Sequence, residues 1–289
     1  MIYEIKNDFI RLKVSSIGAE MKSLIKDGRE YLWQGDPRYW RGTAPNLFPF
    51  IGRSYEGKYS YKGVEYEMGP HGFLKLQEFT KIDSAKNELV LEFASNTATF
   101  KIYPFKFRYT ITYRISGTKL DIIHQVFNEG NEMMYFTMGG HPGFNVPLDD
   151  GLSFEDYYLE FSDTCYPMEL ELTKNLQMDG NAKNYKIEKD KIIRLDHHLF
   201  DFDSITLKNI SKEVTLKSDK GNRKVKVGYP QMGYLGLWHK PQSEAPYLCI
   251  EPWCGLPTRE LCEEISSITD FIRLESNEVY KNSWYIEIE

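Results

Sequence analysis

Four short segments of the chain concentrate glycine, proline, histidine and aromatic residues, in contrast to the polar and apolar alternation elsewhere. They read NLFPFIGR, MGPHGF, MGGHPGFNVP and YLCIEPWCGLP. Loops of this composition on a rigid scaffold commonly carry binding and catalytic groups. The four segments contain Arg53, His71, His141 and Glu251. These side chains can hold a polar ligand and move protons on it.

Glu251 lies between an apolar run and the pair Pro252-Trp253. An isolated glutamate at the end of a strand is usually a solvated carboxylate. Here Pro252 fixes the backbone and Trp253 offers a flat apolar wall. Partial desolvation beside such a wall raises the pKa of a carboxyl group toward the range that suits a general base. The context therefore favours a catalytic carboxylate.

His141 follows Gly139-Gly140 and precedes Pro142-Gly143. A histidine in a tight turn can be a purely structural hydrogen-bonding residue. The glycines let the backbone approach a ligand closely, and Pro142 fixes the turn. We therefore expect a preorganised loop.

Three further side chains are candidates for contact with a ligand. Arg53 can offer a planar fork of donors to vicinal hydroxyl groups, although a surface salt bridge competes with this interpretation. Trp238 can stack on the apolar face of a pyranose, and core packing explains it equally well. Asp203 can accept hydrogen bonds from hydroxyl groups. Asp201 would face the same side of a strand, so the sequence does not separate the two.

Metal and cofactor chemistry find little support in the sequence. His124 alternates within a strand, and His197-His198 lacks a third ligand at metal-site spacing. There is no phosphate-binding loop, dinucleotide fingerprint or serine nucleophile elbow, so we expect no metal and no cofactor. The cysteines, which are Cys165, Cys249, Cys254 and Cys262, are expected to be free thiols. Cys254 lies near the candidate site, but no partner for a nucleophilic role is identifiable.

Period-two alternation recurs along the chain and predicts strands. It is clearest at 88–93, 107–113 and 119–126. Asp27-Gly28, Lys62-Gly63, Gly117 and Gly221-Asn222 separate such runs at hairpin spacing. The best helical candidate is one or two turns over 258–265, with Thr258 as cap. We therefore predict an all-β fold, a large antiparallel β-sandwich with very little helix, forming one domain over residues 1–289.

Charge and hydropathy limit the partners. The 36 basic and 42 acidic side chains give a net charge of -6. The sequence has no cluster of basic and aromatic residues of the kind that forms a nucleic-acid groove, so we expect no nucleic-acid partner. It also has no recognisable signal peptide and no long apolar run, so we expect no membrane insertion. We expect a cytoplasmic protein, either a monomer or a homodimer.

The order and content of the four segments resemble the aldose 1-epimerase family, the galactose mutarotases, and more closely its LacX-like branch. The resemblance extends from about Ile10 to Glu289. It implies the galactose mutarotase-like supersandwich fold and an isomerase that interconverts the α and β anomers of an aldohexose without a cofactor. It makes Glu251 the general base and His141 the general acid. The implied substrate-binding residues are Arg53, His71, Asp203, Asn46 and Trp238.

Three other functions remain open. A hexose-6-phosphate mutarotase of the same fold needs a cationic pocket, for which Arg41, Arg53 and Lys58 are candidates. A carbohydrate sensor would keep the cleft without catalysis, but neutral amides would then suffice in place of Glu251 and His141. A glycoside hydrolase would need a second acid, such as Asp203 or Asp201.

Overall fold

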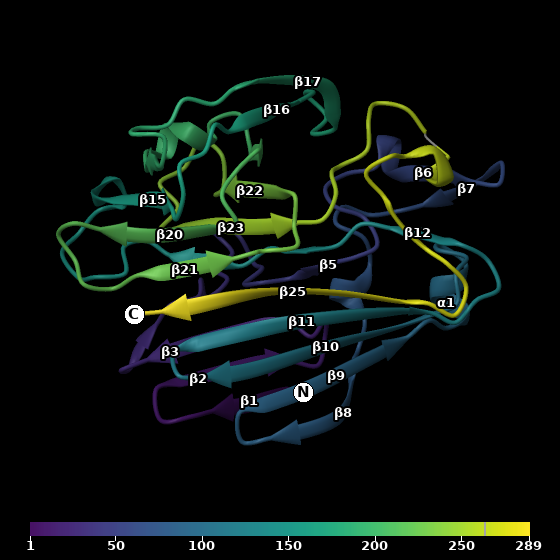
Figure 1. Ribbon diagram of the computed structural model, residues 1–289, viewed down its shortest axis with the longest axis horizontal. Helices are drawn as coiled ribbons and strands as arrows, with labels where there is room; N and C mark the ends of the chain where they lie inside the picture. The colour runs from purple at the N-terminus through teal and green to yellow at the C-terminus, as the bar shows by residue number, and fades with distance from the viewer. Residues whose placement is uncertain (263) are drawn as a thin grey trace.

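The computed structural model describes residues 1–262 and 264–289, and antiparallel sheets dominate it (Figure 1). The largest sheet in the described chain has nine strands. Their order is β18 (Ile192–Arg194), β15 (Tyr157–Phe161), β20 (Glu213–Ser218), β21 (Val225–Gly228), β25 (Val279–Ile288), β11 (Lys119–Asn128), β10 (Phe107–Ser116), β9 (Glu88–Ala94) and β8 (Thr80–Ala85).

A second sheet of eight strands lies against the first, and it carries the residues of the candidate site. Its order is β17 (Met178–Asn184), β16 (Met168–Leu172), β19 (Ile205–Lys208), β22 (Tyr234–Trp238), β23 (Tyr247–Trp253), β13 (Gly139–Gly140) and β5 (Asn46–Leu47), with β14 (Gly143–Asn145) also paired to β23. One continuous apolar core contains residues of both sheets, including Ile122 and Ile286 from the first and Leu237 and Ile250 from the second.

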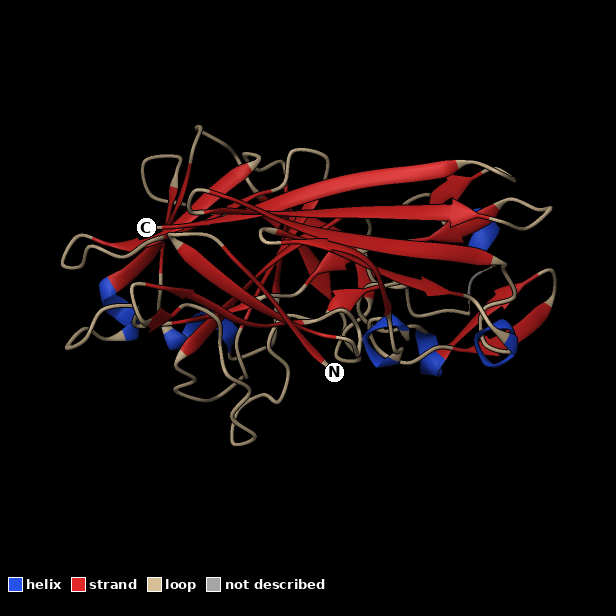
Figure 2. Ribbon diagram, turned by 90° about the horizontal axis from the view of Figure 1, so that it is seen from below, coloured by secondary structure: helices blue, strands red, loops and turns tan. Residues whose placement is uncertain are grey.

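Smaller elements complete the fold. A four-stranded sheet consists of β1 (Ile2–Lys6), β2 (Ile10–Ser15), β3 (Met21–Lys26) and β4 (Arg29–Glu30). Two antiparallel two-stranded sheets are β6 (Lys58–Tyr61) with β7 (Val64–Glu67), which form a hairpin, and β12 (Met134–Phe136) with β24 (Ile272–Leu274), which are distant in the sequence. The short helices, blue in Figure 2, are α1 (Thr97–Phe100) and the 3-10 turns Tyr55–Gly57, Leu74–Leu76, Phe154–Asp156, His197–Phe200 and Ile265–Ser267. No helix in the described chain has the length and apolar character needed to cross a membrane.

The alternation in the sequence forms the strands that it predicts. In β11, buried and partly exposed side chains alternate along all ten residues, because successive side chains point to opposite faces of a sheet. The four predicted turns join β3 to β4, β6 to β7, β10 to β11 and β20 to β21. The all-β antiparallel prediction, with very little helix, is confirmed.

Two local predictions are wrong. The described residues of 258–265 do not form the expected α-helix; only a 3-10 turn begins at Ile265, and residue 263 lies outside the described chain. The Thr258 hydroxyl donates instead to the carbonyl of Arg53, at 3.3 Å, and so ties two loops together. Asp201 and Asp203 do not lie on a strand either, because the chain turns there after the 3-10 turn His197–Phe200 and before β19.

Candidate active site

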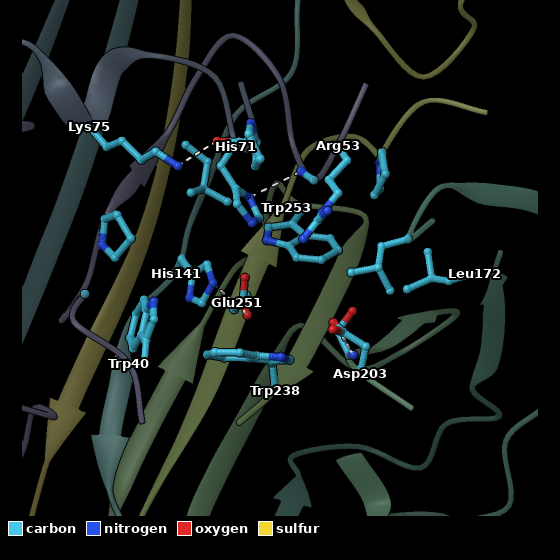
Figure 3. Close-up of a pocket in the computed structure, with 18 of the residues that line it drawn as sticks. Trp40, Arg53, His71, Lys75, His141, Leu172, Asp203, Trp238, Glu251 and Trp253 are labelled. Atoms are coloured by element: carbon cyan, nitrogen blue, oxygen red, sulfur yellow. Dashed lines mark hydrogen bonds and ion pairs between the residues drawn. The ribbon is translucent and has the colours of Figure 1, made fainter. Parts of the chain in front are cut away.

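A cavity of about 500 Å³ opens over β22 and β23, and all four glycine-rich and aromatic segments contribute to its wall (Figure 3). The lining residues from these segments are Leu47, Gly52, Arg53, Pro70, His71, His141, Glu251, Trp253 and Pro257. Residues as far apart in the sequence as Leu47 and Pro257 therefore meet around one space. A pocket of this size holds a small polar molecule such as a monosaccharide.

The register of the sheet places His141 over Glu251. On one side of β23, Gly139 pairs with Trp253 and Gly143 pairs with Cys249. Residue 141, midway between them, therefore lies opposite Glu251. A Cβ atom at Gly139 would lie 2.7 Å from the carbonyl oxygen of Pro252, so glycine permits this close approach of the two strands. The result is a distance of 3.4 Å between His141 Nε2 and Glu251 Oε1.

Burial perturbs both members of this pair. Glu251 is 2% exposed and His141 is 8% exposed. Desolvation raises the pKa of Glu251 well above its ordinary value; the charge of Asp203 adds to the rise, and the nearby Trp253 indole N–H opposes it without completing a hydrogen bond. Desolvation lowers the pKa of His141 to about 3. Glu251 Oε2 and His141 Nδ1 are buried without a hydrogen-bond partner. Such unmet polar atoms are costly and typical of functional sites.

His71 is held by the backbone of Gly52. Its amide N–H donates to the Gly52 carbonyl at 2.7 Å, and Gly52 N–H donates to His71 Nδ1 at 3.2 Å. Because Nδ1 accepts, a neutral ring carries its proton on Nε2 and can donate it to a ligand. Desolvation, followed by the charges of His141, Lys75 and Arg53, lowers the pKa of His71 well below its ordinary value. The neutral donor form therefore prevails.

Tryptophan rings form the apolar walls. Trp40 stacks on His141 with ring centroids 4.8 Å apart, and Trp238 meets the His141 ring edge-on at 5.8 Å. Trp238 and Trp40 contact each other at 5.7 Å, and both line the cavity. Trp238 thus has a ring in the site as well as packing contacts. Such surfaces match the C–H faces of a pyranose.

Sequence reasoning missed several lining residues, among them Trp40 and Lys75. Trp40 lies in a loop, 38–42, in which only Arg41 was a candidate. Gly42 in the same loop packs so tightly against the Trp40 ring that a Cβ atom at Gly42 would lie 2.4 Å from the ring. A tryptophan followed two residues later by glycine is a weak signal that could have indicated a packed loop. Lys75 Nζ donates to the Pro70 carbonyl at 2.6 Å, and desolvation lowers its pKa.

The structure separates the two aspartates. Asp203 lines the cavity, whereas Asp201 is outside the lining and pairs with His198 at 3.0 Å. Asp203 has φ of 132°, a conformation that L-residues rarely adopt and that stores strain. Desolvation raises the pKa of Asp203, partly offset by the Ser204 N–H at 2.8 Å and by Arg53.

Arg53 lines the cavity and, within residues 1–262 and 264–289, makes no side-chain hydrogen bond or ion pair, so its fork of donors is available to a ligand. Arg41 and Lys58 are not part of the lining, and Lys58 pairs with Glu65 at 3.3 Å. The cationic cluster considered from the sequence is therefore not assembled at this cavity.

Asn46 lies beneath the site, outside the cavity lining. Its buried amide nitrogen donates to the carbonyls of Gly18 and Ala19, at 3.0 and 3.1 Å, and to Tyr113 Oη at 3.2 Å. These bonds give the amide nitrogen a structural role. Contact between Asn46 and a substrate stays a prediction, and the geometry gives it no support.

Comparison with known proteins agrees with this architecture. The model of the aldose 1-epimerase family matches residues 1–286. The plasmid-encoded protein LacX of Lactococcus lactis subsp. lactis is 32% identical over 303 residues, covering 100% of this chain and 99% of LacX.

Two solved structures share the fold over the whole chain. A galactose mutarotase related enzyme from Lactobacillus acidophilus has a TM-score of 0.96 at 29% identity, covering 100% of this chain and 97% of the other. A galactose mutarotase-like protein from Lactobacillus casei has a TM-score of 0.95 at 26% identity, covering 100% of both chains. With a family model matched along nearly its entire length and a cavity built from the segments that resembled that family, the chain belongs to the aldose 1-epimerase family.

Proposed function

We propose that the protein is a mutarotase that interconverts the α and β anomers of an unphosphorylated aldohexose. The observation that carries this proposal is the pair of Glu251 Oε1 and His141 Nε2, 3.4 Å apart, at the wall of a cavity of sugar size. A proton acceptor and a proton donor side by side are what the opening of a hemiacetal requires. Membership of the aldose 1-epimerase family supports the same reaction class.

Ring opening moves one proton off the anomeric hydroxyl group and another onto the ring oxygen. Glu251 takes the first proton and protonated His141 gives the second, so the C1–O5 bond breaks and an aldehyde forms. Rotation about C1–C2 exposes the other face of the carbonyl. Closure reverses the transfers: His141 takes the proton of the attacking hydroxyl, and Glu251 returns one to the new anomeric oxygen. Neither residue is consumed.

The electrostatics of the pair fit this cycle. The Glu251–His141 pair shares one transferable proton. Either a carboxylate faces an imidazolium, or a carboxylic acid faces a neutral imidazole. Raising the pKa of Glu251 and lowering that of His141 stabilises the second arrangement, which is the one that accompanies the open-chain aldehyde. Burial thus shifts the pair toward the arrangement that accompanies the open-chain aldehyde.

The other lining side chains hold the sugar. His71 Nε2–H and the free guanidinium of Arg53 donate to ring hydroxyls, and Asp203 accepts from them. The rings of Trp40 and Trp238 cover apolar faces. These contacts leave C1 and the ring oxygen to the catalytic pair.

An unphosphorylated substrate agrees with the charges at the cavity. A phosphate dianion is usually held by several cations and backbone N–H groups. Here Arg53 and Lys75 are the basic side chains that line the cavity, and Lys75 is turned to the Pro70 carbonyl. Comparison of the rates for α-glucose and α-glucose 6-phosphate separates the two substrate classes. A higher kcat/KM for the phosphate ester would contradict this part of the proposal.

The direct test is Glu251→Gln, which preserves shape but cannot accept the proton. We expect the enzymatic rate of mutarotation to fall by about 10²–10⁴-fold. Polarimetry on freshly dissolved α-glucose or α-galactose measures it, with circular dichroism to verify the fold. Glu155→Gln, at a partly exposed carboxylate outside the cavity, is the control and should leave the rate unchanged. A Glu251→Gln variant with the wild-type rate would refute the assignment.

A further inference from the structure

A third donor atom lies beside the catalytic pair. Cys249 Sγ, a His141 ring nitrogen and a Glu251 carboxylate oxygen all lie within 4.8 Å of one another, and all three residues are buried. Cys249 precedes Glu251 by two residues on β23, so both side chains point to the same face of the sheet. Cys249 also pairs with Gly143 of β14, on the chain segment that carries His141.

The hydrogen-bonding capacity of this cluster is largely unused. His141 Nδ1 and Glu251 Oε2 are buried without a partner, and Cys249 makes no side-chain hydrogen bond within the described chain. Cys254, five residues further on, differs: its sulfur interacts with Asn282 Nδ2 at 3.3 Å and with Tyr280 Oη at 3.5 Å. Buried lone pairs without donors are costly unless a ligand satisfies them.

We propose that Cys249, His141 and Glu251 form a binding site for a divalent transition metal of the zinc class, with its fourth position open to the sugar cavity. Zinc favours this mixture of thiolate, imidazole and carboxylate ligands. A dication with one thiolate and one carboxylate is electrically neutral, which offsets the cost of burying each charge alone. As the metal bonds form, the thiol proton of Cys249 and the proton of a protonated Glu251 carboxyl leave to solvent.

The donors must close slightly around the ion. Bonds of about 2.0–2.3 Å in a tetrahedron place ligand atoms about 3.5 Å apart. The His141 to Glu251 distance of 3.4 Å already meets this value. The sulfur lies within 4.8 Å of the other two donor atoms, so it has to approach by about 1.3 Å at most, and rotation of a short cysteine side chain supplies such a shift.

Metal binding and mutarotation exclude each other in this arrangement, because the ion occupies the atoms that transfer protons to the sugar. This consequence rests on the proposed mutarotase activity. Zinc is then an inhibitor of mutarotation, and removal of the thiol relieves the inhibition. The metal is an occupant of the site and takes no part in mutarotation.

The test uses the complete chain, stripped with a chelator and titrated with Zn²⁺ alone by calorimetry. We expect one site, with affinity weakened more than about 100-fold in Cys249→Ala, because loss of even an outer partner of a metal ligand costs 10–100-fold. Cys249→Ser, which keeps more of the volume, should behave alike. Cys254→Ala is the matched control and should bind as the wild type does.

Co²⁺ gives a second readout that requires the thiolate. A sulfur-to-cobalt charge-transfer band is expected in the wild type and in Cys254→Ala, and its absence is expected in both Cys249 variants. Equal Zn²⁺ affinity in wild type and Cys249→Ala, or no stoichiometric binding at all, overturns the inference. Because binding is measured without sugar, failure here leaves the mutarotase proposal intact. A chain that binds Zn²⁺ but does not catalyse mutarotation contradicts the mutarotase proposal alone.

Discussion

Two buried histidines lie in different regions of the molecule and differ in how their nitrogens are used. His124, on β11 of the nine-stranded sheet, accepts from Trp284 Nε1 at 3.0 Å and contacts Tyr109 Oη at 3.2 Å. His141, beside β23 of the eight-stranded sheet, has a buried Nδ1 without a partner and an Nε2 facing a carboxylate. Burial lowers the pKa of each to about 3.

The comparison shows that a perturbed pKa does not by itself mark a catalytic group. The His124 region uses its polar atoms to fix the positions of two aromatic side chains in the core. The His141 region leaves polar atoms unmet beside a cavity, at a cost in stability that ligand binding can recover. Trp284 connects the regions, since Gly140 packs against its ring so closely that a Cβ would lie 2.5 Å away.

The largest effect is expected on activity, when His141 is replaced. His141→Gln removes the proposed general acid while keeping a polar side chain. We expect kcat/KM for mutarotation to fall by about 10²–10⁴-fold, measured by polarimetry. Replacing His124 by glutamine should leave kcat/KM near that of the wild type. Similar losses of activity in the two variants would show that the regions do not differ as described.

A smaller effect is expected on the structural side. His124→Leu leaves the Trp284 indole N–H without its acceptor, and we expect it to destabilise the fold by about 1–3 kcal/mol in chemical denaturation. His124→Gln should recover part of this loss, since its amide oxygen can accept the bond. A leucine variant as stable as the wild type would contradict the importance of this hydrogen bond.

The dependence of stability on acid pH tests whether the buried His124 ring is neutral. The folded-state pKa of His124 is about 3, below the ordinary value of 6.5. The unfolded chain therefore binds more protons in this window, and stability decreases as the pH falls from about 6.5 toward 3. Denaturation at several pH values should show a shallower decrease in His124→Leu. An unchanged slope would contradict the neutral state of the buried ring.

The smallest effect concerns the cost in stability of burying the Glu251 carboxyl, the proposed general base. The pKa of Glu251 is raised in the folded state, so its contribution to stability is present below the unfolded value and is lost as pH rises through the folded one. Glutamine is neutral throughout. Glu251→Gln should therefore be more stable than the wild type at pH 8, with a smaller gain at pH 5. Thermal unfolding at both values measures the gain, and a loss of stability at pH 8 would contradict it.

Much of the architecture followed from local physical rules. Alternation in 107–113 and 119–126 predicts half-buried strands, and glycine-containing turns between them predict antiparallel pairing, because these preferences depend on neighbours in the sequence. The expected helix over 258–265 failed for a tertiary reason: the Thr258 hydroxyl bonds to the carbonyl of Arg53, which is distant in the sequence.

For the candidate site too, some features followed from the sequence and others only from the structure. The sequence by itself indicated which residues are candidates for proton transfer, since Glu251 beside Trp253 and His141 among glycines are unusual in their local context. Only the tertiary structure decided that they lie 3.4 Å apart, that Asp203 rather than Asp201 reaches the cavity, that Asn46 faces the core, and that Trp40 and Cys249 lie beside them. The reason is physical: proximity across strands depends on register and on close glycine contacts, which are properties of the packed sheet.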